Sequence, residues 1–213
     1  MSRVPDLSTA KEDPYKIPIV MATKESLRGY ATIVTDFAKV KVEKTPWPVQ
    51  GWRKARDGTD ILHGEESGEI YYKWEGNTYT ADKVIGCKNE IGFIHNGSLS
   101  SNTHSLPRTH VLAWESTYHP DCGEVFFPKT GDSFVVVLAL PGDDLKLEDF
   151  VAFYCDGTFG IQTHPYVWHL GMFSTKDNVT FLGKQGLLHA CVAVDILKEF
   201  GRLIYVPLTK PEE

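Results

Sequence analysis

The sequence predicts an all-β fold, a sandwich or a barrel, with only a few short helices. Many short apolar segments lie between residues 109 and 206, and turn residues separate them at close spacing. One of them, 134–140, is continuously apolar, which is typical of a central strand covered on both faces. No segment of the chain shows sustained helical periodicity. These three observations together indicate a β-rich core.

The N-terminal part begins with polar residues and continues with short apolar runs. Residues 1–16 are polar and contain two prolines, so we interpret them as an irregular arm. Residues 17–21 predict a strand, and Thr23 can cap a short helix over 24–30. Another apolar run follows at 31–34.

The next part of the chain, from 35 to about 110, has a weak pattern. Pro-Trp-Pro at 46–48, Asp-Gly at 57–58 and Gly-Asn at 76–77 are turn signals, and short segments of β character lie between them. We expect hairpins and loops there, at the periphery of a β domain.

The clearest β pattern comes after residue 108. Turn signals such as Asp-Gly at 156–157 bound the segments, and a short helix is expected near 146–150. The expected strands are 109–114, 124–127, 133–140, 151–155, 160–163, 167–173, 179–182, 188–194 and 203–206.

The composition of the 213 residues excludes several classes of protein. The net charge is −6, so a basic nucleic-acid footprint and a polybasic membrane patch are absent. No apolar run reaches 18 residues, and the N-terminus shows no apolar secretory segment. The four cysteines form no C-x-x-C pair. We therefore expect a cytoplasmic protein with reduced thiols, and neither a nucleic-acid nor a membrane partner.

Two clusters in the β-rich half contain residues that could bind a metal or take part in catalysis. His119 is followed by Glu124 and then Gly131, which is the spacing of the later part of the cupin signature. His169 fits the single histidine of the second cupin signature. Alternate side chains of adjacent strands point into a barrel, so these three residues can form an N/O site for a divalent metal. Zn, Mn, Fe and Ni all suit such ligands.

Other interpretations of these residues stay open. His119 and Glu124 can instead form a buried hydrogen-bonded pair without a metal. His164 is either a ligand or substrate contact, or a residue on a surface strand. Trp168 alternates with its neighbours, a pattern more often found in a core than in a site.

Several blocks of the sequence resemble the ureidoglycolate lyases. An E-x-x-x-H-P element stands at 115–120, and a Val-Trp-His element stands at 167–169. The similarity covers 20–35 and about 109–182 well, and 36–108 poorly. The remaining blocks are Thr-Lys-Glu-Ser-Leu-Arg-Gly-Tyr at 23–30, Glu-Val-Phe-Phe-Pro at 124–128, the apolar strand at 134–138 and Leu-Glu-Asp-Phe-Val-Ala-Phe at 147–153.

The resemblance implies a cupin-type double-stranded β-helix barrel that is usually a homodimer. Together with the polar N-terminus, it predicts an irregular arm over 1–16 and one cupin-like domain over 17–213. Within that domain, 17–108 would supply peripheral strands and loops, and 109–206 would form the barrel core. The implied reaction splits ureidoglycolate, a small molecule, into glyoxylate and urea in allantoin catabolism.

Residues of this chain have candidate roles in such a reaction. Glu115 and His164 are the candidate bases, and Lys129 is a candidate acid or carboxylate anchor. Trp168 and Tyr166 are candidate substrate contacts. His119, Glu124 and His169 are the candidate ligands of a divalent metal, and no organic cofactor is expected.

This sequence departs from the family pattern at two of these positions. Glu124 stands where the family has glutamine, and Lys129 stands where it has methionine. Two alternatives to a ureidoglycolate lyase therefore remain. One is a related lyase, isomerase or hydrolase of another small hydroxy or keto acid, and the other is a non-catalytic cupin that binds a small anion.

Overall fold

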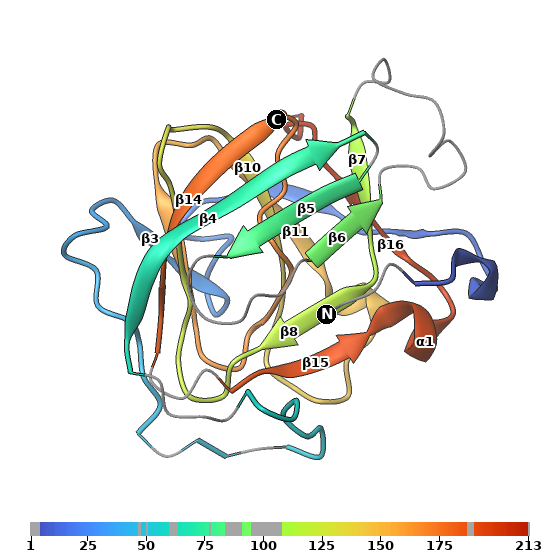
Figure 1. Ribbon diagram of the computed structural model, residues 1–213, viewed down its shortest axis with the longest axis horizontal. Coiled ribbons are helices and arrows are strands. Elements are labelled where there is room, and N and C mark those ends of the chain that lie inside the picture. The colour runs from blue at the N-terminus through green and yellow to red at the C-terminus, as the bar shows by residue number, and fades with distance from the viewer. Residues whose placement is uncertain are drawn as a thin grey trace.

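The computed structural model describes most of the chain and confirms the all-β prediction. Within the described residues the strands form two sheets, and the helices are short (Figure 1). The described residues are 5–46, 48–49, 51–59, 64–76, 78–83, 91–94, 108–186 and 190–212.

The larger sheet contains ten strands in the described part of the chain. Their order across the sheet is β1-β16-β7-β6-β5-β4-β14-β9-β12-β3. In that order the strands are Tyr15–Lys16, Ile204–Pro207, His110–Ala113, Ile91–Ile94, Thr78–Lys83, Glu66–Glu75, Asn178–Gln185, Val125–Pro128, Gly160–Thr163 and Ala31–Val34.

The smaller sheet contains six strands, in the order β15-β8-β13-β10-β11-β2. All six residues of β10 are buried, which confirms a central strand within the apolar run at 134–140. The strand ends at Ala139, and Leu140 is exposed. In sheet order the strands are Val192–Asp195, Glu115–Tyr118, Trp168–His169, Phe134–Ala139, Val151–Cys155 and Ile19–Met21.

The two sheets face each other and enclose an aromatic core. The ring of Phe134, on β10, packs edge-on against Phe181, on β14, with 5.0 Å between the ring centroids. Phe126, on β9, contacts the imidazole of His169 from the opposite sheet. Side chains of both sheets therefore fill one barrel interior, as expected of a cupin-like barrel.

The N-terminal half contributes strands to this barrel. β4 pairs with β14 along the whole length of β14, and β5 pairs with β4. Tyr72 and Tyr79 from these two strands are buried and stack with 5.7 Å between ring centroids. In Figure 1, β4 and β5 run side by side across the front of the molecule. Strands β4 and β5 therefore contribute side chains to the core as well as to the surface.

The helices are shorter than the sequence suggests. Residues 24–30 form successive turns instead of the predicted helix, although Thr23 does accept a hydrogen bond from the Ser26 amide. Gly29 adopts a φ of +85°, which turns the chain into β3 before a helix can extend. Among the described residues, the helical segments are the 3₁₀ turns η1 (Leu7–Thr9) and η3 (Leu147–Asp149) and the α-helix α1 (Ile196–Phe200).

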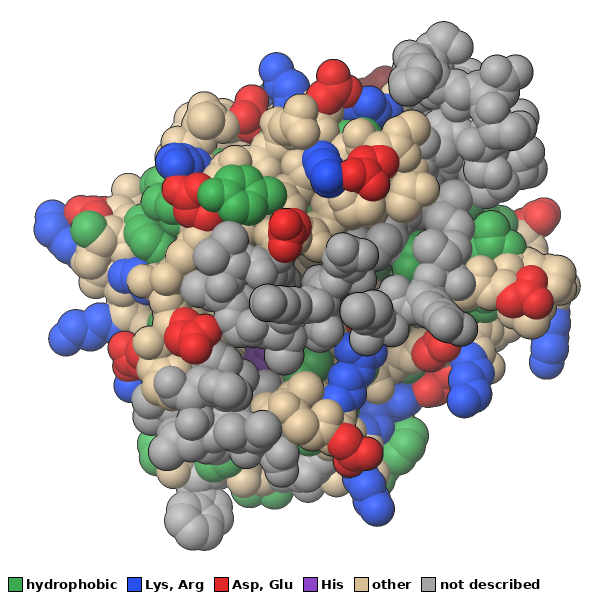
Figure 2. Space-filling view, in the orientation of Figure 1, with side chains coloured by type: hydrophobic (Ala, Val, Ile, Leu, Met, Phe, Trp, Pro, Cys, Tyr) green, Lys and Arg blue, Asp and Glu red, His purple; other side chains and the backbone are tan. Residues whose placement is uncertain are grey.

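Acidic and basic side chains are mixed on the described surface. Figure 2 shows them interspersed over one face of the molecule, as the near-balanced charge of the sequence suggests. None of the described helices is long and apolar enough to cross a membrane.

Candidate metal centre

His119, Glu124 and His169 come together inside the barrel. His119 directly follows β8, Glu124 directly precedes β9, and His169 ends β13. The two histidines belong to the smaller sheet, whereas Glu124 leads into the larger one. The candidate ligands therefore meet where the two sheets face each other.

The three side chains are close enough to bind one ion. The Glu124 Oε2 atom lies 3.3 Å from the Nε2 atom of His119 and 3.1 Å from the Nε2 atom of His169. One ligand atom from each residue lies within 4.8 Å of the others. The distance between the two imidazole centroids is 5.2 Å. This geometry places all three predicted ligands around one point.

Backbone carbonyls fix the orientation of both imidazoles. The Nδ1 atom of His119 lies 2.8 Å from the Ala190 carbonyl oxygen, and that of His169 lies 3.0 Å from the Val167 oxygen. A carbonyl oxygen only accepts, so each Nδ1 must carry the proton and donate it. In the neutral tautomer each Nε2 then presents a lone pair toward Glu124. Metal-binding histidines in proteins are held in this way.

Glu124 is held by two groups of its own. The side-chain amide of Gln185 donates to Glu124 Oε1 at 2.7 Å, and the Glu124 amide donates to the Thr163 hydroxyl at 3.1 Å. These bonds leave Oε2 directed at the two histidines. Sequence reasoning missed Gln185, because a lone glutamine carries no motif. Its alternation with Val179 and Phe181 along β14 was the available signal, since both of these residues are buried.

The residues present fit a divalent metal. Glu124 is 1% exposed and His169 is 5% exposed, so water does not screen the carboxylate. Buried carboxylate and imidazole lone pairs that face one another are stable only when a cation or protons lie between them. Two imidazole nitrogens and one carboxylate oxygen are ligands that Zn, Mn, Fe and Ni all accept.

Comparison with known proteins covers the segment that holds this centre. The family model described as ureidoglycolate lyase matches residues 99–190, which include all three candidate ligands. The chain is 33% identical over 114 residues to ureidoglycolate lyases of Salmonella enteritidis PT4 (strain P125109) and Salmonella newport (strain SL254). In both cases the match covers 44% of this chain and 71% of the relative.

The chain belongs to the ureidoglycolate lyase family.

The first candidate base of the ureidoglycolate lyase pattern, Glu115, lies on the same side of its sheet as the metal centre. Glu115 and Thr117 alternate along β8, and Thr117 pairs directly with His169. The Glu115 carboxylate is 11% exposed and forms an ion pair with Arg56, in which the Arg56 Nη2 atom lies 2.6 Å from the Glu115 Oε2 atom. The structure therefore keeps Glu115 as a candidate for proton transfer.

The side chain of the second candidate base, His164, pairs with Glu43. Its Nδ1 atom is 2.6 Å from Glu43 Oε2, and its amide donates to the Tyr30 carbonyl. Glu43 also donates its own amide to Gln162 at 2.7 Å. Ile161 and Phe126 pair with each other and face inward, and Gln162 follows Ile161 on the strand. Successive side chains point to opposite faces, so the contact between Glu43 and Gln162 lies on the outer side of the sheet.

Lys129 is on the outer face of the larger sheet. Its ammonium group pairs with Glu69 of β4, and Glu69 also accepts a hydrogen bond from Tyr71. Tyr71 is 42% exposed, whereas its neighbours Ile70 and Tyr72 are buried and face the core. The structure therefore does not bring Lys129 next to the metal centre.

Trp168 and Tyr166 lie on the far side of the smaller sheet. Trp168 precedes His169 on β13, so the two side chains point to opposite faces. The Trp168 indole N–H donates to the Gly142 carbonyl at 2.8 Å, and the ring is fully buried against Tyr118 and Arg53. The Tyr166 hydroxyl accepts from the Val49 amide. In the structure, both side chains therefore contact other parts of the protein, and their contact with substrate stays a prediction.

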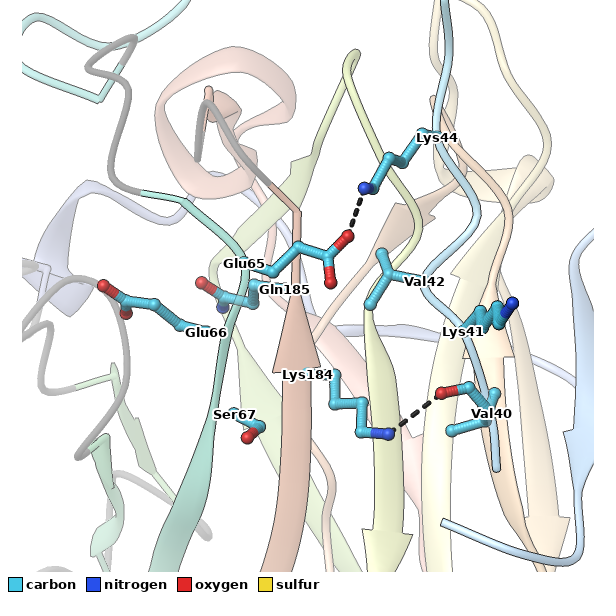
Figure 3. A pocket seen from close by; sticks show the side chains of 9 residues that line it. All are labelled: Val40, Lys41, Val42, Lys44, Glu65, Glu66, Ser67, Lys184 and Gln185. Atoms are coloured by element: carbon cyan, nitrogen blue, oxygen red, sulfur yellow. Dashed lines mark hydrogen bonds and ion pairs between the residues drawn. The ribbon is translucent and has the colours of Figure 1, made fainter. Parts of the chain in front are cut away.

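A cavity of about 520 Å³ adjoins the metal centre. Figure 3 shows its lining, in which Lys44 pairs with Glu65 and Lys184 donates to the Val40 carbonyl. Gln185 lines the same cavity and donates to Glu124. Gln185 therefore separates the cavity from the buried carboxylate of the metal centre.

Proposed function

We propose that this protein is a metal-assisted ureidoglycolate lyase that splits ureidoglycolate into glyoxylate and urea. The proposal rests on the three-ligand cluster of His119, Glu124 and His169, which lies inside the segment that matches the family. The substrate is a carbinolamide that carries a carboxylate. Its cleavage needs a base for the hydroxyl proton and an acid for the departing urea nitrogen.

His119, Glu124 and His169 would hold the divalent ion. When bound, such an ion polarises the substrate oxygen atoms and lowers the pKa of the hydroxyl group. The chain itself supplies the proton transfer. Glu115 accepts the hydroxyl proton, the carbon–nitrogen bond breaks as the aldehyde forms, and the same proton goes to the urea nitrogen. Proton transfer of this kind contributes roughly 10²–10⁴-fold in rate.

Chelation and metal add-back test this proposal. The metal-free protein should lose turnover of ureidoglycolate and regain it with one of Zn, Ni, Mn or Fe. Full turnover after verified metal loss would contradict the role of the metal. A metal-loaded, folded protein that does not release glyoxylate from ureidoglycolate would contradict the substrate.

A second candidate function follows from Glu124. Glutamine is the residue that the family resemblance expects at this position, and Glu124 adds a negative charge to the centre. This observation favours a related lyase, isomerase or hydrolase of another small hydroxy or keto acid. Side-by-side assays of ureidoglycolate and such acids distinguish the two functions, because only the true substrate should reach the higher kcat/KM.

We also propose that the protein is a cytoplasmic homodimer. The compartment is supported by the reduced, buried thiols of Cys122 and Cys155, because cytoplasmic proteins keep their cysteines reduced. The dimer is supported by β2, the last strand of the smaller sheet, which carries the exposed Val20. Pairing two copies at this edge would cover that side chain.

A further inference from the structure

We propose that Arg56 binds the carboxylate of the substrate and that Glu115 holds its guanidinium group until the substrate arrives. The inference rests on the proposed function and names the anion-binding residue of the same site. Arg56 lies outside the segment that matches the family. It therefore belongs to the part of the chain in which the sequence resembles the ureidoglycolate lyases poorly.

The backbone around Arg56 extends the smaller sheet. Ala55 forms a bridge with Val192 of β15, and the Arg56 amide donates to the Cys191 carbonyl at 2.8 Å. The Cys191 amide in turn donates to the Thr59 hydroxyl at 3.1 Å. Residues 55–59 thus lie beside β15 as an added edge, in the loop below β15 in Figure 1.

The Arg56 side chain reaches the face of the sheet that carries the metal centre. Its Nη2 atom lies 2.6 Å from Oε2 of Glu115. Glu115 shares its face of β8 with Thr117, and Thr117 pairs directly with His169. Arg56 and the candidate ligand His169 therefore belong to the same side of one sheet.

The same short segment also positions His119. Ala190 accepts the Nδ1 hydrogen bond of His119, and Cys191 accepts the amide of Arg56. Two strand spacings, about 10 Å, separate the backbone of Arg56 from that of β8. Along the strand, Glu115 lies two residues, about 7 Å, from Thr117, the direct partner of His169, so a small substrate at the metal centre extends along this face toward the guanidinium group.

The chemistry of the pair suits exchange with a substrate. Arg56 is 35% exposed, whereas Glu115 is 11% exposed, so the guanidinium group is the more accessible partner. A guanidinium fork binds carboxylates in a planar, bidentate manner. When the substrate carboxylate takes the place of Glu115, that residue becomes available to accept the hydroxyl proton. Arg56 would thus couple substrate binding to proton transfer.

Substitution of Arg56 tests this role with two readouts. In the metal-loaded protein, Arg56→Met should raise the KM for ureidoglycolate and the Kd for oxamate, a stable small carboxylate, by about 10–100-fold each. Metal content should not change. Arg202→Met is the matched control, because Arg202 forms a distant ion pair with Glu12. The control should leave both constants at the wild-type values.

Each outcome decides the inference. A folded Arg56→Met protein with unchanged KM and Kd would show that the pair with Glu115 is only structural. If Arg56→Met does not fold, Arg56→Lys replaces it: a raised Kd for oxamate supports the role, and a wild-type Kd overturns it. A third outcome is that the wild-type protein binds oxamate through Arg56 and yet shows no lyase activity. That result would support the role of Arg56 and contradict the proposed function.

Discussion

Glu124 joins the two histidines at the metal centre. Its Oε2 atom faces both Nε2 atoms, and its Oε1 atom accepts the Gln185 amide. The carboxylate is almost fully buried, so solvent screens its interaction with a bound ion only weakly. The affinity of the centre for a divalent ion should therefore depend strongly on this charge.

Glu124→Gln should reduce metal affinity by more than about 100-fold, because changes to residues that only support a ligand already reduce affinity by 10–100-fold. Elemental analysis of the purified protein and turnover of ureidoglycolate measure the effect. Lys129→Met is the control, since Lys129 lies on the outer face and should keep wild-type metal content. Full metal occupancy in Glu124→Gln would contradict the ligand assignment.

Gln185→Leu should lower metal affinity by about 10–100-fold while the protein stays folded, because the leucine no longer orients the Glu124 carboxylate. Metal titration followed by circular dichroism separates the two properties. Equal metal affinity in the variant and the wild type would mean that Thr163 and the backbone suffice to hold Glu124.

At the residue scale, the sequence identified the three candidate ligands but not all of their neighbours. The spacing of His119 and Glu124 and the position of His169 predicted three residues that the structure does bring together. The sequence could not show whether the Lys129 side chain faces the barrel interior, because alternation along a strand defines two faces but does not say which one is inward. Gln185 could not be found either, since its role depends on a contact with a strand far away in sequence.

At the scale of elements, β13 separates a functional face from a structural one. His169 points into the barrel, while Trp168 packs behind the sheet against Tyr118 and Arg53. Asp143 accepts the Tyr118 hydroxyl, and burial together with this carboxylate raises the Tyr118 pKa well above its usual range. Tyr118 thus stays protonated and keeps donating at physiological pH.

Trp168→Phe should lower the free energy of unfolding by about 1–3 kcal/mol, because a smaller ring replaces the fully buried indole and the hydrogen bond to the Gly142 carbonyl is lost. The KM for ureidoglycolate should stay unchanged. Chemical denaturation and steady-state kinetics measure the two quantities. A selective rise in KM without a loss of stability would instead support the sequence-based prediction that Trp168 contacts substrate.

The turn between β11 and β12 depends on a glycine. Gly157 has a φ of +92°, and an added Cβ atom would overlap the Gly131 backbone. Gly157→Ala should therefore lower the free energy of unfolding by about 3 kcal/mol or more. Gly76 also has a positive φ, but no atom lies within 4 Å of the added Cβ. Gly76→Ala should lower it by only about 1–2 kcal/mol, and equal losses would contradict the role of the close approach.

At the scale of the whole molecule, the edge of the smaller sheet is the proposed dimer interface. Light scattering after size exclusion should give a mass of twice the 23.9 kDa chain. Val20→Lys should shift the mass to that of one chain, because charges on an edge strand oppose pairing. A single-chain mass for the wild type at tens of micromolar would contradict the dimer, and a dimeric Val20→Lys would place the interface elsewhere.

The sequence alone determined the all-β class, the central strand and the three candidate ligands. These features depend on local patterns, since alternation along a strand selects its faces and spacing across a turn selects neighbours. Only the tertiary structure decided that β4 and β5 join the barrel, that Gln185 holds Glu124 and that Arg56 faces Glu115. Each of these contacts joins segments distant in sequence, and strand pairing over such distances leaves no periodic signal in either partner.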